Sequence, residues 1–193
     1  MKLNQIAGTY QLPLIIVIIL SLISGFYISN RANNQVSQRY AEYAKNIHQK
    51  TQTLIEEKRE AILLIALSMV ENQHIKDALK NGQSDSLQLD ASSHRFKRHT
   101  PLDSLWFHVV RKNGDSLYRS WTQKRGDNVL NARLDMAIML QNPEIKTAIS
   151  TGIFDLTFKA MVPVYDGKEF LGIFEVIAKF NSIADKLKKE GIE

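Results

Sequence analysis

The sequence contains no cysteine among its 193 residues. This absence excludes disulfide bonds, thiolate nucleophiles and cysteine-ligated zinc sites, and it is compatible with an oxidising compartment without requiring one. The sequence also lacks a Walker loop, a His-Glu-x-x-His pair and a nucleophile-elbow motif. The spacing of His94, His99 and His108 fits no zinc ligand set. We therefore expect no catalytic residues, no metal site and no cofactor.

Charged residues are missing from the first apolar segment of the chain. Residues 12–28 read LPLIIVIILSLISGFYI, and extension to Asn30 gives the length that crosses a bilayer, about 20 residues. A cleaved signal peptide is the alternative, but residues 21–24 form a poor cleavage site and hydrophobicity continues beyond them. The pattern predicts an uncleaved transmembrane helix over residues 12–30 after a short head over residues 1–11, and that head is cytoplasmic if the rest of the chain is exported.

Acidic residues are absent before Arg31, and Lys2 is the only basic residue there. Arg31, Arg39 and Lys45 follow the apolar segment, so the local excess of positive charge does not choose an orientation. The whole chain has 25 basic and 20 acidic residues, a mild positive balance. This balance suits a domain beside an anionic membrane or one that binds anionic ligands, and it is too small to indicate nucleic-acid binding. The lipid bilayer and a small anionic molecule are the expected partners.

Proline and glycine are absent from residues 32–80, where strong helix formers dominate. This pattern predicts one long helix or two stacked ones, ended by Asn81-Gly82. Apolar and aromatic residues recur at steps of three and four from Tyr40 to Ile65, which favours a homodimer through the long helix. The run from Ala61 to Leu67 is apolar on nearly every side, so we expect it to be buried.

Beyond Gly82 the periodicity changes to the alternation of strands. Two hairpins are predicted, and each has a turn that contains glycine: Asn113-Gly114 in the first and Asp166-Gly167 in the second. The expected elements are strands 104–110 and 117–121, a helix from Asp127 or Asn128 to Ser150 that breaks near Asn142-Pro143 and ends at Thr151-Gly152, strands 154–165 and 169–180, and a helix 182–190. Hairpins covered by helices define the α+β class, with a sheet-bearing core at residues 104–180.

Two segments carry a resemblance to a known family. The first is LWFHVVRKNGDSLYRSW at residues 105–121, followed by Gly126-Asp127 before a helix that holds Arg133. The second is TGIFDLTFKAMVPVYDGKEFLGIFE at residues 151–175. From about residue 32 onward the chain resembles the Cache-type sensor domain, a PAS-like sheet found in chemoreceptors, sensor kinases and cyclic-di-GMP enzymes.

The resemblance implies a single-pass receptor of the bacterial inner membrane, with residues 31–193 as a periplasmic sensor domain. Receptors of this type re-enter the membrane to reach a cyclase, phosphodiesterase, kinase or chemotaxis module, and no second apolar span follows residue 30 in this sequence. We therefore expect the output module to be absent from the chain. A pilin-like subunit and a membrane-tethered adaptor that binds a protein partner are the alternatives.

The resemblance also implies a ligand pocket between the sheet and the segments that cross it, with Arg-x-Trp on the strand after the turn. Arg119 and Trp121 stand there. A guanidinium fits a carboxylate and an indole supplies an apolar wall, so the expected ligand is a small anionic metabolite with a carboxylate. Arg119 can instead pair with Asp155 or Glu175, and Trp121 can fill the core. Amino-acid-binding relatives often place tyrosine where this chain has Thr122, which argues against an amino acid.

Four further residues complete the predicted ligand-binding set. Arg133 is expected to face inward, with Asp135 on a different face of its helix. Asp155 and Lys159 share one face of a strand, where they can hold a zwitterion or form an ion pair with each other. Tyr165, from the Pro-Val-Tyr of the second hairpin, is the last.

Overall fold

The structure is a computed structural model that describes residues 3–100, 102, 104–151 and 155–192. It divides into two compact units, residues 1–50 and residues 51–193. The sheet and the candidate site both lie in the second unit.

Helix α1 (Leu3–Val70) begins before the predicted membrane segment and continues through it. It includes a window of mean hydropathy 2.0, none of it buried, that is long and apolar enough to cross a membrane. The predicted helix over residues 32–80 is interrupted at Asn72, whose side chain accepts a hydrogen bond from the His74 amide and caps α2 (Gln73–Asn81). Gly82 ends α2 with a φ of 69°, so the predicted stop is confirmed.

Five antiparallel strands form one sheet in the order β2-β1-β5-β4-β3. Both predicted hairpins are confirmed: β1 (Leu105–Arg111) with β2 (Ser116–Arg119), and β4 (Leu156–Asp166) with β5 (Glu169–Lys179). Gly114 has a φ of 88°, a conformation that the turn requires and that glycine adopts most easily. The α+β prediction is confirmed, with helices on a five-stranded sheet.

The predicted helix from Asp127 or Asn128 to Ser150 is wrong at both ends, whereas its predicted break near Asn142-Pro143 is confirmed by the helix end at Gln141. Helix α4 covers only Leu134–Gln141, and β3 (Lys146–Thr151) follows it as the edge strand beside β4. Pro143 cannot donate a helical hydrogen bond and disfavours helical backbone at the residue before it, so α4 ends there. The predicted helix end at Gly152 and the strand start at Phe154 lie outside the described residues.

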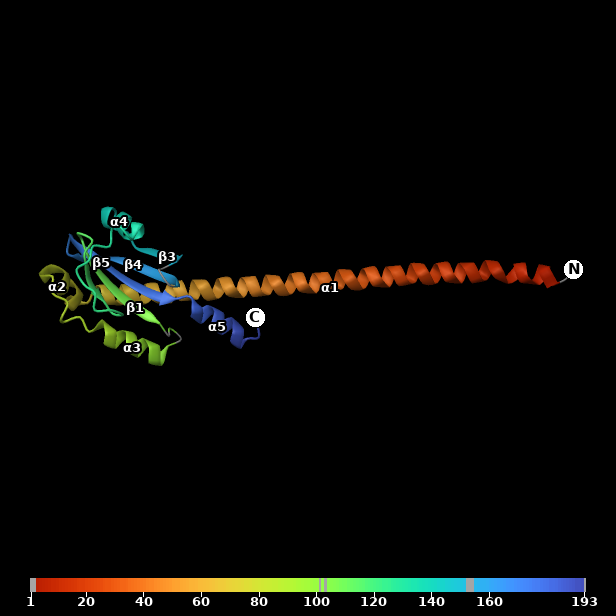
Figure 1. Cartoon of the computed structure of the whole chain (residues 1–193), viewed down its shortest axis with the longest axis horizontal. Coiled ribbons are helices and arrows are strands. Elements are labelled where there is room, and N and C mark those ends of the chain that lie inside the picture. The colour runs from red at the N-terminus through yellow and green to blue at the C-terminus, as the bar shows by residue number, and fades with distance from the viewer. Residues whose placement is uncertain (1–2, 101, 103, 152–154, 193) are drawn as a thin grey trace. The chain divides into compact units, whose positions relative to one another are not determined.

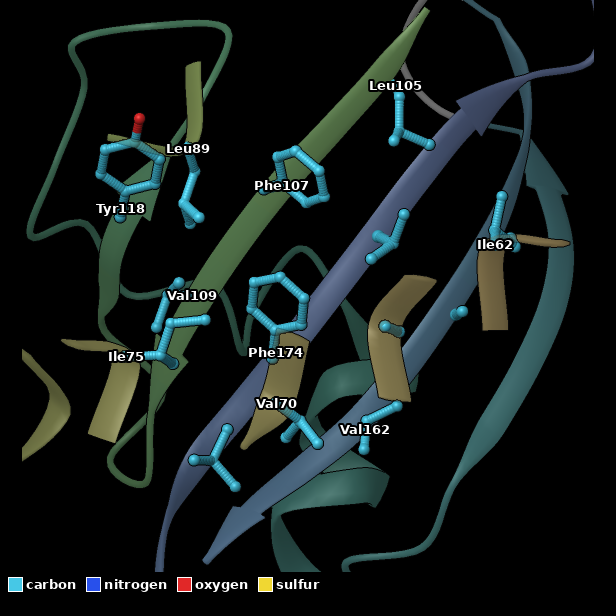
Figure 2. Packing of buried hydrophobic residues seen from close by; sticks show 14 of the residues in the cluster. Ile62, Val70, Ile75, Leu89, Leu105, Phe107, Val109, Tyr118, Val162 and Phe174 are labelled. Carbon is cyan, nitrogen blue, oxygen red and sulfur yellow. The ribbon is translucent and has the colours of Figure 1, made fainter. Parts of the chain in front are cut away.

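Helices cover the two faces of the sheet unequally (Figure 1). Residues 51–70 of α1, together with α2 and α3 (Leu89–His99), pack on one face, and α4 packs on the other. Phe107 and Phe174 stack at 5.9 Å between ring centroids in the larger cluster (Figure 2). Helix α5 (Asn181–Lys189) follows β5 and contributes Ile183 to the same cluster.

The apolar run over residues 61–67 is buried on one side only. Ile62 and Ala66 have no exposed surface, whereas Leu64 remains 66% exposed, so the prediction of burial on nearly every side is wrong. Leu54 and Lys58, which the three-four pattern assigned to a dimer seam, are buried in the second unit. The C-terminal half of the three-four pattern therefore packs into the core of the second unit and is not free to form a dimer seam.

Candidate functional site

The candidate site lies on the face of the sheet that α4 covers. Phe107 and Phe174 point to the opposite face, so their neighbours His108 and Glu175 point to this one, because successive side chains alternate along a strand. The antiparallel register pairs His108 on β1 directly with Glu175 on β5. Trp106 lies two residues before His108 on β1, so its side chain points to the same face.

A hydrogen-bonded series of three buried side chains forms the floor of the site. His108 Nδ1 lies 3.0 Å from Glu175 Oε2, and His108 Nε2 lies 3.0 Å from Ser116 Oγ. Burial lowers the pKa of His108 in spite of its carboxylate partner, so the ring is neutral near pH 7. Since Glu175 can only accept, Nδ1 donates to it and Nε2 accepts from the Ser116 hydroxyl.

Glu175 is fully buried and remains ionised. Burial raises the pKa of its carboxyl, but the charge of Arg133 and the hydrogen bond from His108 outweigh burial and hold the pKa at about 2. Arg133 Nη2 donates to Glu175 Oε1 at 2.6 Å. A buried carboxylate with two such partners is a fixed negative charge at the centre of the sheet face.

Arg133 connects Glu175 to a second carboxylate, that of Asp135. Arg133 Nε and Nη2 each donate to Asp135, at 2.8 Å to Oδ1 and Oδ2 respectively. Burial alone would lower the pKa of Arg133, but the charges of Glu175 and Asp135 raise it above its usual value. Lys159, whose side chain is 8% exposed, approaches Asp135 Oδ2 at 3.6 Å. We call these four residues, Arg133, Asp135, Lys159 and Glu175, the charge cluster.

The charge cluster corrects the prediction for Asp135. Arg133 precedes α4 and Asp135 lies in its first turn, so the two side chains fold back on each other instead of facing apart. The expectation of different faces assumed that both residues lie inside one helix. Because α4 begins at Leu134, Arg133 lies outside the helix and that assumption does not hold.

Arg119 has a different partner from either one predicted. Its Nη1 and Nη2 donate to the two carboxylate oxygens of Asp127, at 2.5 and 2.9 Å, and Nη1 also donates to the backbone carbonyl of Lys124. The Arg119 guanidinium holds the pKa of Asp127 well below its usual range. The alternative pairs with Asp155 or Glu175 are therefore wrong, and Arg119 instead holds the segment around Asp127, which is hydrogen-bonded to the start of β2 at Ser116.

Aromatic rings lie beside this segment. Trp121 follows β2 instead of lying within it, and its ring is 5.6 Å from those of both Trp106 and His108. Because 39% of Trp121 is exposed, it does not simply fill the core. Trp121 thus forms a partly open aromatic wall at the edge of the site.

Asp155 and Lys159 do not pair with each other. Asp155 Oδ2 accepts from Lys179 Nζ at 2.7 Å, and Lys179 also lies over the Trp106 ring. The predicted ion pair between Asp155 and Lys159 is therefore wrong, because Lys159 approaches Asp135 instead. Tyr165 lies near the β4–β5 turn, where its ring packs against Phe170 at 5.5 Å.

The structure therefore brings Arg133, Lys159 and Trp121 of the predicted set to one face, with Arg119 and Asp155 at its margins. Sequence reasoning missed His108, Ser116 and Asp127 as members of the site. A usable signal was present for His108, a polar residue within the apolar strand LWFHVV. Its role depends on the register with β5, which no local pattern shows.

One hydroxyl on this face lacks a partner. Ser150 Oγ on β3 is buried and makes no hydrogen bond to any residue that the structure describes. Ser150 pairs in register with Thr157, two positions before Lys159 on β4. A buried hydroxyl without a partner is unfavourable, and this atom has almost no exposed surface through which a ligand could reach it.

Residues 37–192 match the dCache_3 family, described as the double sensory domain of two-component sensor kinases. The chain belongs to this family. No curated protein sequence matches the chain significantly.

Two solved structures show the same fold at low sequence identity. The sensor domain of the Vibrio cholerae histidine kinase DctB is 16% identical, with a TM-score of 0.54 over 72% of this chain. The sensory domain of the Campylobacter jejuni chemoreceptor Tlp3 is 11% identical, with a TM-score of 0.50 over 73% of this chain. The chain spans 57% and 61% of the length of these two domains.

Proposed function

We propose that the chain is the periplasmic sensor region of a single-pass receptor in the bacterial inner membrane, and that it binds a small carboxylate on the α4 face of the sheet. The membership in a sensory family and the apolar segment of α1 support this proposal. The observation that carries it is the pair of cations, Arg133 and Lys159, that converge on one carboxylate position above buried Glu175. The output module is then a separate part outside residues 1–193, of the kinase, cyclase, phosphodiesterase or chemotaxis type.

Each side chain around the charge cluster has a role in this proposal. Arg133 presents two donors that match the two oxygens of a carboxylate, and Lys159 adds a second positive charge. Trp121, which is partly exposed, supplies an apolar wall. Arg119, at the margin of the site, acts indirectly in this proposal by holding Asp127 and the Lys124 carbonyl.

A hydrolase is an alternative function that the geometry of this site suggests. Ser116, His108 and Glu175 form the serine, histidine and carboxylate series of a catalytic triad. Ser116, however, has no exposed surface, so its hydroxyl cannot reach a substrate carbonyl. Glu175 is also engaged by Arg133. We assign the series a structural role and propose no enzymatic activity.

Replacement of Lys159 by methionine tests the binding site. Lys159→Met keeps the length of the side chain and removes its charge, so it should weaken the binding of a carboxylate about ten- to a hundredfold, the loss expected for a charge-assisted contact. Isothermal titration of the full chain in lipid nanodiscs, with acetate, butyrate, succinate and glutamate, measures the effect. Lys168→Met, in the β4–β5 turn, is the matched control.

Two results would contradict the proposal. If none of the carboxylates binds the wild-type chain, the membrane-tethered adaptor becomes the better explanation. If a carboxylate binds and Lys159→Met binds it as tightly as Lys168→Met does, the ligand site lies elsewhere in the domain.

We also propose that the chain forms a parallel homodimer through the first part of the long helix. Tyr40 and Tyr43 are 72% and 56% exposed, and their three-residue spacing suits a helix pair. Tyr40→Cys should therefore cross-link in membranes, whereas Gln49→Cys, nine residues away and on the opposite side of the helix, should not. Equal cross-linking at the two positions would reject the seam.

A further inference from the structure

Asp135 occupies the position that the proposed ligand carboxylate would need. Its two oxygens accept from Arg133 Nε and Nη2, both at 2.8 Å, which is the paired geometry of a guanidinium and a bound carboxylate. Lys159 Nζ, 3.6 Å from Oδ2, approaches the same carboxylate from β4. The cations are thus already arranged around a carboxylate, but that carboxylate belongs to the chain.

We propose that Asp135 is an internal substitute for the ligand, and that a monocarboxylate ligand displaces it from Arg133 and Lys159. This inference rests on the proposed function and adds two statements to it. It identifies which side chain must move, and it names the charge of the ligand that fits.

The two carboxylates of the charge cluster differ in their ability to leave. Glu175 has no exposed surface and is also held by His108, so its release would place a charge in the core without a partner. Asp135 is 32% exposed and lies in the first turn of α4, where its carboxylate can turn toward water. Displacement therefore acts on Asp135, while Glu175 stays and keeps the Arg133 guanidinium in place.

The charge balance after displacement selects the ligand class. Arg133 and Lys159 carry two positive charges and Glu175 carries one negative charge, so one positive charge is left for the ligand to neutralise. At the margins, Lys179 pairs with Asp155, Asp127 is shared by Arg119 and the exposed Lys124, and His108 is neutral. A monocarboxylate neutralises the one positive charge that Arg133, Lys159 and Glu175 leave, whereas a dicarboxylate brings a second negative charge that these three residues do not balance.

Displacement also has a structural consequence at α4. Asp135 Oδ1 accepts a hydrogen bond from the Met136 amide at 3.0 Å, and Met136 is fully buried against the sheet. Departure of the carboxylate removes both this bond and the link from α4 to Arg133. The start of α4 is therefore the element whose contacts depend on whether the ligand is bound.

The test compares wild type, Asp135→Asn and Asp135→Ser by isothermal titration of the full chain in nanodiscs. Butyrate and succinate are the probes, since they have the same chain length and differ by one carboxylate. Both variants keep an oxygen near the Met136 amide but lose the competing charge, so each should bind butyrate about tenfold more tightly than wild type does. Asp166→Asn, an exposed partner of Lys80, should bind as wild type does. Wild type should prefer butyrate to succinate.

The outcomes separate this inference from the function beneath it. If wild type binds a carboxylate but both folded Asp135 variants bind it equally or more weakly, Asp135 is not an internal substitute and the proposed sensor function stands. Tighter binding of succinate than of butyrate rejects the monocarboxylate class. If neither wild type nor the Asp135 variants bind any carboxylate, the proposed function fails together with this inference.

Discussion

Replacement of Arg133 by methionine should lower the free energy of unfolding by about 3–5 kcal/mol. The loss arises because Glu175 would remain in the core without its principal counter-charge. Glu175 has no exposed surface, and its main charged partner is Arg133 Nη2 at 2.6 Å. Urea unfolding of Arg133→Met, followed by circular dichroism, measures the effect.

A second substitution identifies the cause of that loss. Glu175→Gln removes the buried charge yet keeps an oxygen that can accept from His108, so Arg133→Met combined with Glu175→Gln should lose clearly less stability than the sum of the two single losses. Lys80→Met breaks the exposed pair with Asp166 and should change the unfolding free energy far less than Arg133→Met does, because water screens an exposed ion pair. If Arg133→Met is no more costly than Lys80→Met, Glu175 has another means of stabilising its charge.

Replacement of Arg119 by alanine should lower the free energy of unfolding by about 2–3 kcal/mol, with little direct effect on ligand binding. Three hydrogen bonds from its guanidinium are lost: two to Asp127 and one to the Lys124 carbonyl. The loss should be smaller than for Arg133, because Asp127 is 29% exposed and regains water when its partner is removed. Urea unfolding without ligand and titration with carboxylate give the two quantities.

A double-mutant cycle checks the assignment of Arg119. If the Asp127 pair accounts for the loss, Arg119→Ala should cost little further stability in an Asp127→Ala background. The contrary result is Arg119→Ala with wild-type stability and binding weakened about ten- to a hundredfold. That combination would mean that Arg119 releases Asp127 and contacts the ligand itself.

Local sequence patterns predicted the parts of the fold that local interactions stabilise. The two hairpins depend on turns at Asn113-Gly114 and Asp166-Gly167, where neighbouring residues alone favour the chain reversal. The end of α2 at Gly82 is of the same kind. These predictions needed no knowledge of distant residues, because backbone conformation at a turn is decided within a few positions.

Strand β3 shows where that reasoning fails. KTAIST at residues 146–151 is short and has exposed residues at the sheet edge, so its periodicity is weak. It is a strand because β4 offers it a hydrogen-bonding edge, from Lys146 opposite Met161 to Thr151 opposite Leu156. The prediction continued the preceding helix through these six residues, although the β-branched Thr147, Ile149 and Thr151 favour a strand.

The sequence by itself determined the α+β class, the apolar segment of α1 and the two hairpins, and it predicted Arg133 and Lys159 as ligand-binding residues, which remains a prediction. Only the tertiary structure decided the partners of the charges: Asp127 for Arg119, Lys179 for Asp155, and Asp135 with Glu175 for Arg133. Ion-pair partners depend on strand register and on how a crossing segment returns over the sheet, both of which join residues far apart in the chain. Turns and hydrophobic periodicity involve neighbouring residues, so the sequence shows them directly.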